Sequence, residues 1–481
     1  MANSRHTYDW TIMIYMASND YYSDQAAQKF LKELNELGRE MKRHSKSGRV
    51  KILLQSFGNW NRHHREGAYY SRLYEIQAGF LRKKRVTLDI VNVNMGDEHT
   101  LSDFIGRCKE GFPAKKYMLF LWGHGTGVGM YNYDLEESKR NIGHLKKFLN
   151  AVKNQRPPKF DDIWEDTIFE REIIHTKEEH PTNIFYFNVS KHPEVKKYLP
   201  DKIRLDSLTS NEIREALRVN FKKNYGKIDI VCILGCAMQM VEFGYEIRKH
   251  CNYYVASEEL MFWEGYNYKK TFSRLFRNPT MRAKELAEFL VTDATKKSTY
   301  TKAEKRGIAI SCVDLNQSGE LARQINGISK AILNKWEIVV DFVANARRRC
   351  YHFGEKSYDS YIDATWFFKC LSGQLKNRPA YRHIYNRAMA LVNFLEQNYI
   401  LAKYIGADRN IGKNAQTVGG HGVSIYMPYG KKDERNNDTR RFPFRKDSPF
   451  KVKFVNNEWN NLVFAFIDHI HGDPQKRNKR L

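Results

Sequence analysis

The sequence lacks the marks of several protein classes. No apolar run approaches the roughly 18 residues that a membrane-spanning helix needs, and the opening stretch, MANSRHTYDW, has no apolar core of a secretory signal. The 7 cysteines are odd in number, and their spacing suggests no disulfide framework. We therefore expect reduced, mostly buried thiols and a cytoplasmic protein.

Motifs for metals and phosphates are also missing. The sequence has no Cys-x-x-Cys pair and no His-Glu-x-x-His, and the neighbouring His63 and His64 form an isolated pair. No loop has the ligand spacing of a calcium site. Glycines alternate over residues 123–129, but no Gly-Lys-Ser/Thr ending of a phosphate loop follows. We expect no metal and no other cofactor.

Positive charge is in clear excess. Lys and Arg number 80 against 55 Asp and Glu, which gives a formal net charge of +25. Such a charge can indicate nucleic-acid or anionic-surface binding. The basic residues are spread along the whole chain, however, and no zinc finger, RNP-type strand or basic zipper is recognisable. We interpret the surplus as a solvated surface and do not expect direct nucleic-acid binding.

The composition is that of a globular protein with a sizeable core. The chain has 481 residues, of which 42% are hydrophobic and 13% aromatic, enough for two or three domain-sized units. Short apolar runs alternate with amphipathic stretches, which predicts an α/β domain with a largely parallel sheet. Strands are expected at 10–17, 50–55, 68–76, 117–122, 230–234, 253–256 and 307–313, with paired strands around 399–405 and 423–427. Helices are expected at 20–43, 98–109, 207–225, 238–250, 281–297, 317–345 and 381–397.

Cys236 follows one of the most apolar of these runs. Residues 230–234 read as a strand buried on both faces, Gly235 breaks the run, and helical spacing begins at Met238. Catalytic groups of open α/β sheets gather at the carboxyl ends of strands, and a helix N-terminus stabilises a thiolate. Cys236 is therefore a candidate nucleophile, with a buried structural cysteine as the alternative. Cys232 lies within the strand and is expected to be inert.

His124 has a similar position after the expected strand at 117–122. Gly123 and Gly125 flank it, so that a substrate backbone could approach the imidazole closely. If the two strands are neighbours, His124 and Cys236 converge at one edge of the sheet, with the equipment for acyl transfer. An ordinary surface histidine is the alternative.

Six sequence blocks resemble the clostripain family of cysteine peptidases and occur in that family's order. They are DWTIMIYMA at 9–17, NMGD at 94–97, LWGHGTG at 121–127, GCAM at 235–238, ASEE at 256–259 and GVSIYMP at 422–428. The resemblance implies a caspase-like three-layer sandwich, a Cys/His dyad, protein or peptide substrates and cleavage after Arg or Lys. It also implies that the enzyme can be a zymogen activated by internal cleavage.

The resemblance assigns roles to the candidate residues. Cys236 would attack the scissile carbonyl to form a thioester, and His124 would act as general acid and base. The oxyanion hole would consist of the backbone N–H groups of Gly125 and Cys236, as in caspase-like enzymes. His421 also lies among glycines, but its block resembles a structural motif of the family, so we rank it below His124.

One position departs from the family's pattern. Family members usually carry Asp two residues before the nucleophile, facing the pocket for a basic P1 side chain, and this chain has Leu234 there. Glu264 falls in a region that also lines this pocket in the family and could restore the charge; a solvated loop glutamate is the alternative. We still expect a basic P1 residue, with a non-basic preference as the alternative.

Residues 131–206 form a long charged insertion between His124 and Cys236. Connections of this length within a domain are usually functional or mobile. The family resemblance implies that the segment is the place of an activating cut, and an ordinary surface insertion is the alternative. We expect a caspase-like peptidase domain over 1–300 and a packed C-terminal domain over 301–481. The competing hypothesis is a binding or regulatory protein that has drifted from catalysis; the presence of both Cys236 and His124 argues against it.

Overall fold

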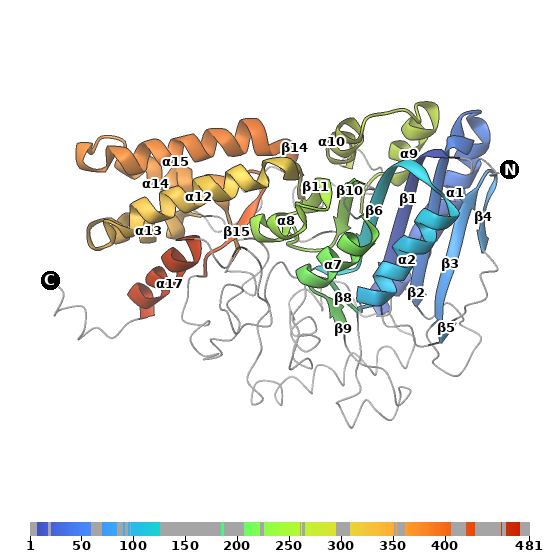
Figure 1. Cartoon of the computed structure of the whole chain (residues 1–481), viewed down its shortest axis with the longest axis horizontal. Coiled ribbons are helices and arrows are strands. Elements are labelled where there is room, and N and C mark those ends of the chain that lie inside the picture. The colour runs from blue at the N-terminus through green and yellow to red at the C-terminus, as the bar shows by residue number, and fades with distance from the viewer. Residues whose placement is uncertain are drawn as a thin grey trace, which may run out of the picture.

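A large mixed sheet organises the chain. The computed structural model describes residues 7–17, 21–58, 70–83, 90–91, 95–96, 98–125, 184–186, 206–221, 226–259, 261, 265–294, 308–350, 353, 361–405, 420–428, 454 and 458–471. The strands follow the order β14-β12-β11-β10-β6-β1-β2-β3-β4, and β5 pairs with β3 (Figure 1). Their bounds are β1 Tyr8–Ala17, β2 Val50–Gly58, β3 Tyr70–Gln77, β4 Phe80–Lys83, β5 Ile90–Val91, β6 Ala114–Trp122, β10 Ile228–Leu234, β11 Cys251–Ser257, β12 Ala309–Asp314 and β14 Ile400–Ile405.

The middle of this sheet is parallel. The strands β11, β10, β6, β1 and β2 pair in parallel, whereas β12, β14, β3 and β4 add antiparallel pairs at the two edges. Trp10–Ala17 of β1 and Ile230–Leu234 of β10 are buried, and apart from Thr11 both runs are apolar. A parallel strand covered on both faces has no side to turn to water, which explains these apolar runs.

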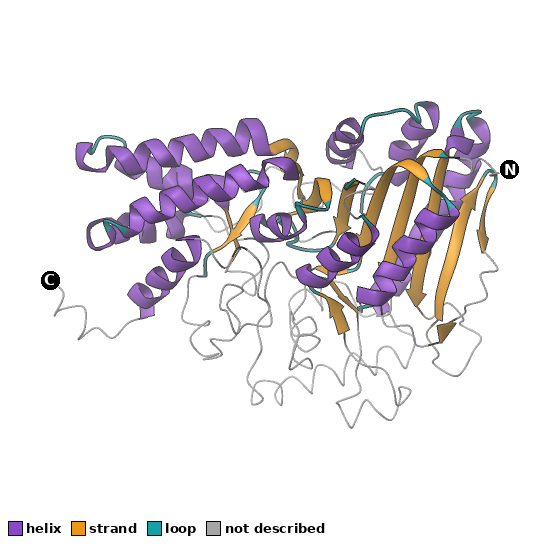
Figure 2. Cartoon of the chain, viewed as in Figure 1, coloured by secondary structure: helices purple, strands orange, loops and turns teal. Residues whose placement is uncertain are grey.

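Helices cover both faces of the sheet (Figure 2). On one face α2 (Glu98–Gly111), α7 (Ser210–Asn220) and α8 (Val241–Ile247) pack in succession, and on the other α1 (Tyr21–Arg43), α9 (Tyr268–Arg277) and α10 (Ala283–Ala294) do so. Their apolar faces join the side chains of the strands in a continuous core. Within the described residues, no helix combines the length and the apolar character that crossing a bilayer requires.

A second group of helices lies beside the β14 edge of the sheet (Figure 1). It consists of α12 (Ser318–Leu333), α13 (Trp336–Arg349), α14 (Ala364–Leu375), α15 (Arg382–Phe394) and α17 (Glu458–His471). A small antiparallel pair, β13 (Tyr361–Asp363) with β15 (Ser424–Tyr426), connects this group to the sheet region near α8. The expected domain boundary at residue 300 stays a prediction. The strands β12 and β14, which follow residue 300 in the chain, belong to the main sheet.

Several expected elements differ from the structure. The expected helix at 207–225 begins with β9 (Asp206–Leu208), and α7 starts only after Thr209, whose hydroxyl accepts the Glu212 N–H while the Glu212 carboxylate accepts the Thr209 N–H. The expected helix at 317–345 is two helices, α12 and α13, separated at Asn334 and Lys335. The strands expected to pair near 399–405 and 423–427 instead pair with β12 and β13, respectively.

Candidate active site

The candidate site lies where β6 and β10 end. These strands are parallel neighbours, with Trp122 opposite Leu234 at their carboxyl ends. The Gly123 N–H donates to the Leu234 carbonyl at 3.1 Å, so the pairing continues into the turns after both strands. The carboxyl ends of neighbouring parallel strands meet at one edge, which is where ligands of open α/β sheets bind. The sequence-based expectation that the two strands are neighbours is confirmed.

The two turns touch through glycine. A Cβ on Gly125 would lie 2.5 Å from the Cys236 carbonyl oxygen and 2.7 Å from its nitrogen, and one on Gly235 would lie 3.1 Å from the Gly125 Cα. Only glycine allows two backbones to approach so closely. His124 and Gly125 form β7, in which His124 pairs with Phe185 of β8 (Ile184–Tyr186). His124 therefore directly precedes Gly125, the residue that packs on the Cys236 backbone. A contact between the His124 imidazole and the Cys236 sulfur stays a prediction.

Cys236 lies in the turn that follows β10, not at the start of a helix. Helix α8 begins at Val241, so the expected helix at 238–250 is shorter, and the idea that its N-terminus stabilises a thiolate at Cys236 is wrong. Ala237 takes a positive φ of 54°. A non-glycine residue in this region costs energy that the surrounding structure must supply.

The sulfur itself has a defined partner. The Cys236 side chain is buried, with 8% of its surface exposed, and Sγ accepts the Met261 N–H at 3.3 Å. The sulfur also lies 4.0 Å from the Met261 carbonyl oxygen, so both backbone polar groups of Met261 face it. The nitrogens assigned to the oxyanion hole, those of Gly125 and Cys236, belong to the two segments in contact, and their role stays a prediction.

Leu234 points toward the segment that follows Met261. It is buried, and a Cβ on Gly265 would lie 2.8 Å from its Cδ1. Gly265 has a φ of +59°, so glycine is required there for its conformation as well as for space. Glu264 directly precedes Gly265 but lies outside the described residues. The Tyr268 hydroxyl also faces this position, 2.5 Å from where a Gly265 Cβ would lie, so the described surroundings of Leu234 include a polar group.

The other candidate thiols and the second histidine have different surroundings. Complete burial raises the pKa of the Cys232 and Cys251 thiols, which keeps them protonated at neutral pH. This agrees with the expectation that Cys232 is inert. The His421 ring stacks on Trp366 with centroids 5.4 Å apart, and its Nδ1 lies 3.3 Å from Asp363 Oδ1. These contacts hold His421 against Trp366 and Asp363, and its ranking below His124 stays a prediction.

The sequence reasoning missed a buried polar cluster next to this site. Glu258 and Asp363 are fully buried, and both bond to the segment around His421. The sequence shows glycines around His421 and an acidic pair at 258–259. Neither pattern predicts that these two segments are in contact. Among the described residues, no three His, Cys, Asp or Glu side chains are gathered as metal ligands would be.

Comparisons with known proteins agree with this geometry. The sequence profile described as the clostripain family matches residues 15–150 and 186–462, which is most of the chain. No curated protein sequence matches the chain.

Solved structures show the same fold. One is a secreted C11 cysteine protease from Bacteroides thetaiotaomicron with an irreversible peptide inhibitor, 15% identical, with a TM-score of 0.54 and coverage of 94% of this chain and 99% of that one. Another is an inactive zymogen C11 protease from Parabacteroides distasonis, 16% identical, with a TM-score of 0.52 and coverage of 95% and 99%. The expected caspase-like α/β fold is confirmed, and the chain belongs to the clostripain family of cysteine peptidases.

Proposed function

We propose that the chain is an endopeptidase in which Cys236 and His124 form the catalytic dyad. The packing of Gly125 against the backbone of Cys236 carries this proposal, because it leaves His124 adjacent to the nucleophile's loop. The Cys236 thiolate attacks the scissile carbonyl, and the N–H groups of Gly125 and Cys236 stabilise the oxyanion. The C–N bond then breaks, the imidazolium of His124 gives its proton to the leaving amine, and a thioester remains. Water, deprotonated by the imidazole, hydrolyses the thioester and restores the thiolate.

Two active-site variants test the dyad. Cys236→Ala and His124→Ala should each lower kcat for a peptide substrate by about 10³-fold or more, as loss of one member of a catalytic unit does. Cys370→Ala is the matched control, because Cys370 is a half-buried thiol on α14 that is remote in sequence from both segments. A thiol-directed peptidyl probe should label the wild type once per chain and fail to label Cys236→Ala. Full activity in His124→Ala would refute the dyad.

The proposed P1 preference is basic. It derives from the family resemblance and from Glu264, which is the neighbour of the glycine against which Leu234 packs. The lack of charge on the Leu234 side chain favours the competing preference for a non-basic P1 residue. Fluorogenic peptides that differ only at P1 decide between the two: higher kcat/KM for Arg or Lys supports the proposal, and equal or higher kcat/KM for an apolar P1 overturns it.

Internal cleavage within residues 131–206 is the proposed activation step. The segment lies between His124 and Cys236 in the sequence, and one similar structure is described as an inactive zymogen. Intact mass and N-terminal sequencing of purified enzyme, taken before and after activity appears, test this step. A chain that stays uncut and is fully active contradicts it.

The cytoplasm is the proposed location, and a drifted binding protein is the competing function. Presence of the chain in the soluble cell fraction would support the location, and its presence in the culture medium would contradict it. Labelling of Cys236 by the peptidyl probe separates a peptidase from a drifted binding protein, because only a catalytic thiolate reacts with it stoichiometrically.

A further inference from the structure

The loop that carries Cys236 is held between two other segments. On one side, the Ala237 N–H donates to the Glu259 carbonyl at 3.1 Å and the Gln239 N–H to the Ser257 carbonyl at 2.9 Å. On the other side, the Ser424 N–H of β15 donates to the Gln239 carbonyl at 2.8 Å. The catalytic loop thus lies between the end of β11 and a strand from the C-terminal part of the chain.

Glu258 connects the end of β11 to the segment that contains β15 through its side chain. Its side chain is fully buried, Oε2 accepts the Gly422 N–H at 2.8 Å, and Oε1 lies 3.4 Å from Ser424 Oγ. Gly420 has a φ of +70°, and a Cβ there would lie 3.0 Å from Glu258 Oε2. The glycine-rich segment therefore brings its backbone to this carboxyl group in a way that other residues could not.

A second buried carboxyl group lies beside the first. Asp363 caps α14 by accepting the Trp366 N–H at 2.5 Å, and it also accepts the His421 N–H. Its Oδ1 is 3.3 Å from His421 Nδ1. Asp363 therefore has partners of its own, namely the N-terminus of α14 and the backbone N–H of His421.

We infer that Glu258 is a positioning residue for Cys236, whose carboxyl group ties the catalytic loop and the end of β11 to β15. The inference deepens the proposed peptidase function and rests on it for the link to catalysis. Ser257 and Glu259 hold the loop through their carbonyl groups, and Glu258, between them, fixes that same segment to Gly422 and Ser424. We call the contacts of the Glu258 carboxyl group with Gly422 and Ser424 the clamp. Removal of the Glu258 side chain leaves the backbone hydrogen bonds of Ala237 and Gln239 without the clamp.

The protonation state of Glu258 follows from its neighbours. Burial and the negative charge of Asp363 raise the pKa of Glu258 well above its usual value, while the Gly422 N–H and Lys403 oppose the rise. The raised pKa favours the protonated acid, in which Oε1 accepts the Ser424 hydroxyl and Oε2 accepts the Gly422 N–H.

Amide hydrogen exchange of residues 236–240 tests the clamp without relying on activity. Glu258→Ala should raise exchange at Ala237 and Gln239, and it should lower kcat by about 10-fold with little change in KM, as expected for a lost buried hydrogen bond that positions the nucleophile. Glu258→Gln has the shape of the protonated acid and should restore both readouts at neutral pH.

Asp293→Ala is the matched control. Asp293 is an equally buried carboxylate on α10, and its bond goes to Lys270 on α9, so its removal should lower the melting temperature without changing exchange over 236–240. The inference is overturned if residues 236–240 exchange as slowly in Glu258→Ala as in the wild type. It is also overturned if Asp293→Ala raises exchange over these residues as much as Glu258→Ala does. If the wild type cleaves no peptide while the exchange results hold, the proposed function fails and the clamp stands.

Discussion

Gly125 lies so close to Cys236 that a methyl group on it would be 2.5 Å from the Cys236 carbonyl oxygen. Real carbon atoms do not approach an oxygen so closely, and Gly125→Ala must therefore push the His124 turn away from the nucleophile. A displacement of about 1 Å at a reacting pair costs about 10²-fold in rate. We expect Gly125→Ala to lower kcat by about this factor while the melting temperature falls only modestly, as measured with a peptide substrate and by calorimetry.

A second glycine provides the control for this prediction. A Cβ on Gly373, in α14, would meet no atom within 4 Å. Gly373→Ala should therefore leave kcat unchanged and stabilise the protein by up to about 1 kcal/mol, through the higher helix propensity of alanine. Wild-type kcat in Gly125→Ala would mean that the two turns separate without consequence, and that the dyad does not depend on their contact.

The positions of the candidate residues were predictable from the sequence because they depend on local patterns. The apolar run ending at Leu234 predicts a strand buried on both faces, and the break at Gly235 places Cys236 at its end. The apolar runs at 117–122 and 230–234 also predict that both strands belong to the sheet, but not that they are neighbours. Their order could not be derived, because pairing depends on contacts between distant segments.

The surroundings of the site were less predictable, because they depend on tertiary contacts. The sequence between Met238 and His250 has helical spacing, yet its first residues bond to the end of β11 and to Ser424 and stay extended. The role of Glu258 could not be inferred from its neighbours in sequence, since its partner Gly422 is 164 residues away. The helices α9, α14 and α17 were also missed.

The strained conformation after the nucleophile leads to a prediction about Ala237. Its φ of 54° lies in the left-handed region, and its side chain is buried. Ala237→Gly relieves the strain but adds freedom to the unfolded chain, so the free energy of unfolding should change by less than about 1 kcal/mol. Ala237→Val puts a branched side chain into the same conformation and should destabilise by about 2 kcal/mol or more. Equal stability of the two variants in urea unfolding would contradict the assigned conformation.

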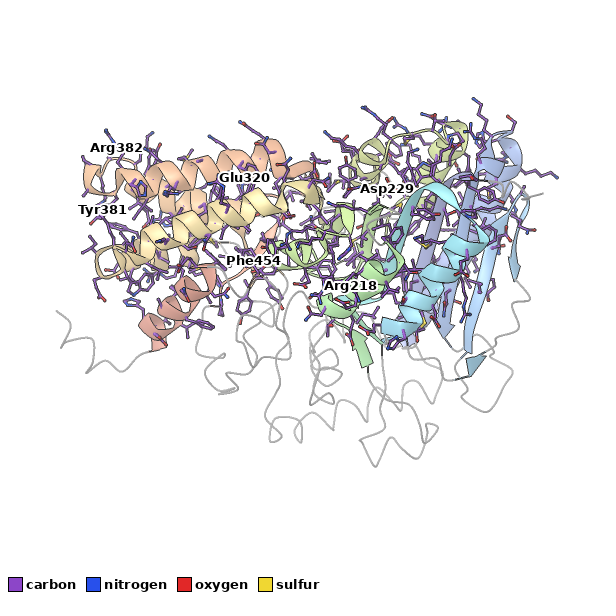
Figure 3. All side chains as sticks on the ribbon, viewed as in Figure 1. Arg218, Asp229, Glu320, Tyr381, Arg382 and Phe454 are labelled. Carbon is purple, nitrogen blue, oxygen red and sulfur yellow. The ribbon has the colours of Figure 1, made fainter. Side chains whose placement is uncertain are left out.

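Stability should fall as the pH rises from mildly acidic values to about 8. Burial raises the pKa of Glu242 to about 8, although the Tyr426 N–H, which donates to it at 2.9 Å, opposes the rise. Burial likewise raises the pKa of Asp229 to about 6; Asp229 lies on β10 and is labelled in Figure 3. A carboxyl group whose pKa is raised by folding binds its proton more tightly in the folded state. Its contribution is therefore complete below its unfolded pKa and is lost as the pH rises through the folded value.

Glu242→Gln isolates one part of this pH dependence. The amide cannot ionise, so the melting temperature of this variant should fall less than that of the wild type between about pH 6 and pH 9. This range contains the pKa of Glu242, which is about 8. Calorimetry at constant ionic strength measures the difference. Glu320→Gln is the control, because Glu320 is a surface carboxylate whose bonds to Arg323 and Gln324 lower its pKa. It should leave the slope unchanged. Parallel slopes for Glu242→Gln and the wild type would show that Glu242 is ionised throughout this range.

Leu234→Asp tests whether this position faces the P1 side chain. The substitution places a carboxylate where other family members usually have one, and a charge-assisted bond to a basic P1 residue should raise the ratio of kcat/KM for Arg over Leu at P1 by about 10- to 100-fold. Because Leu234 is only 2% exposed, the variant should also have a lower melting temperature than the wild type. Leu234→Asn has the same shape without the charge, so it should show the loss of stability but no gain for Arg. An unchanged ratio in Leu234→Asp, in protein that is folded at the assay temperature, would mean that residue 234 does not contact the P1 side chain and that P1 selectivity comes from other residues.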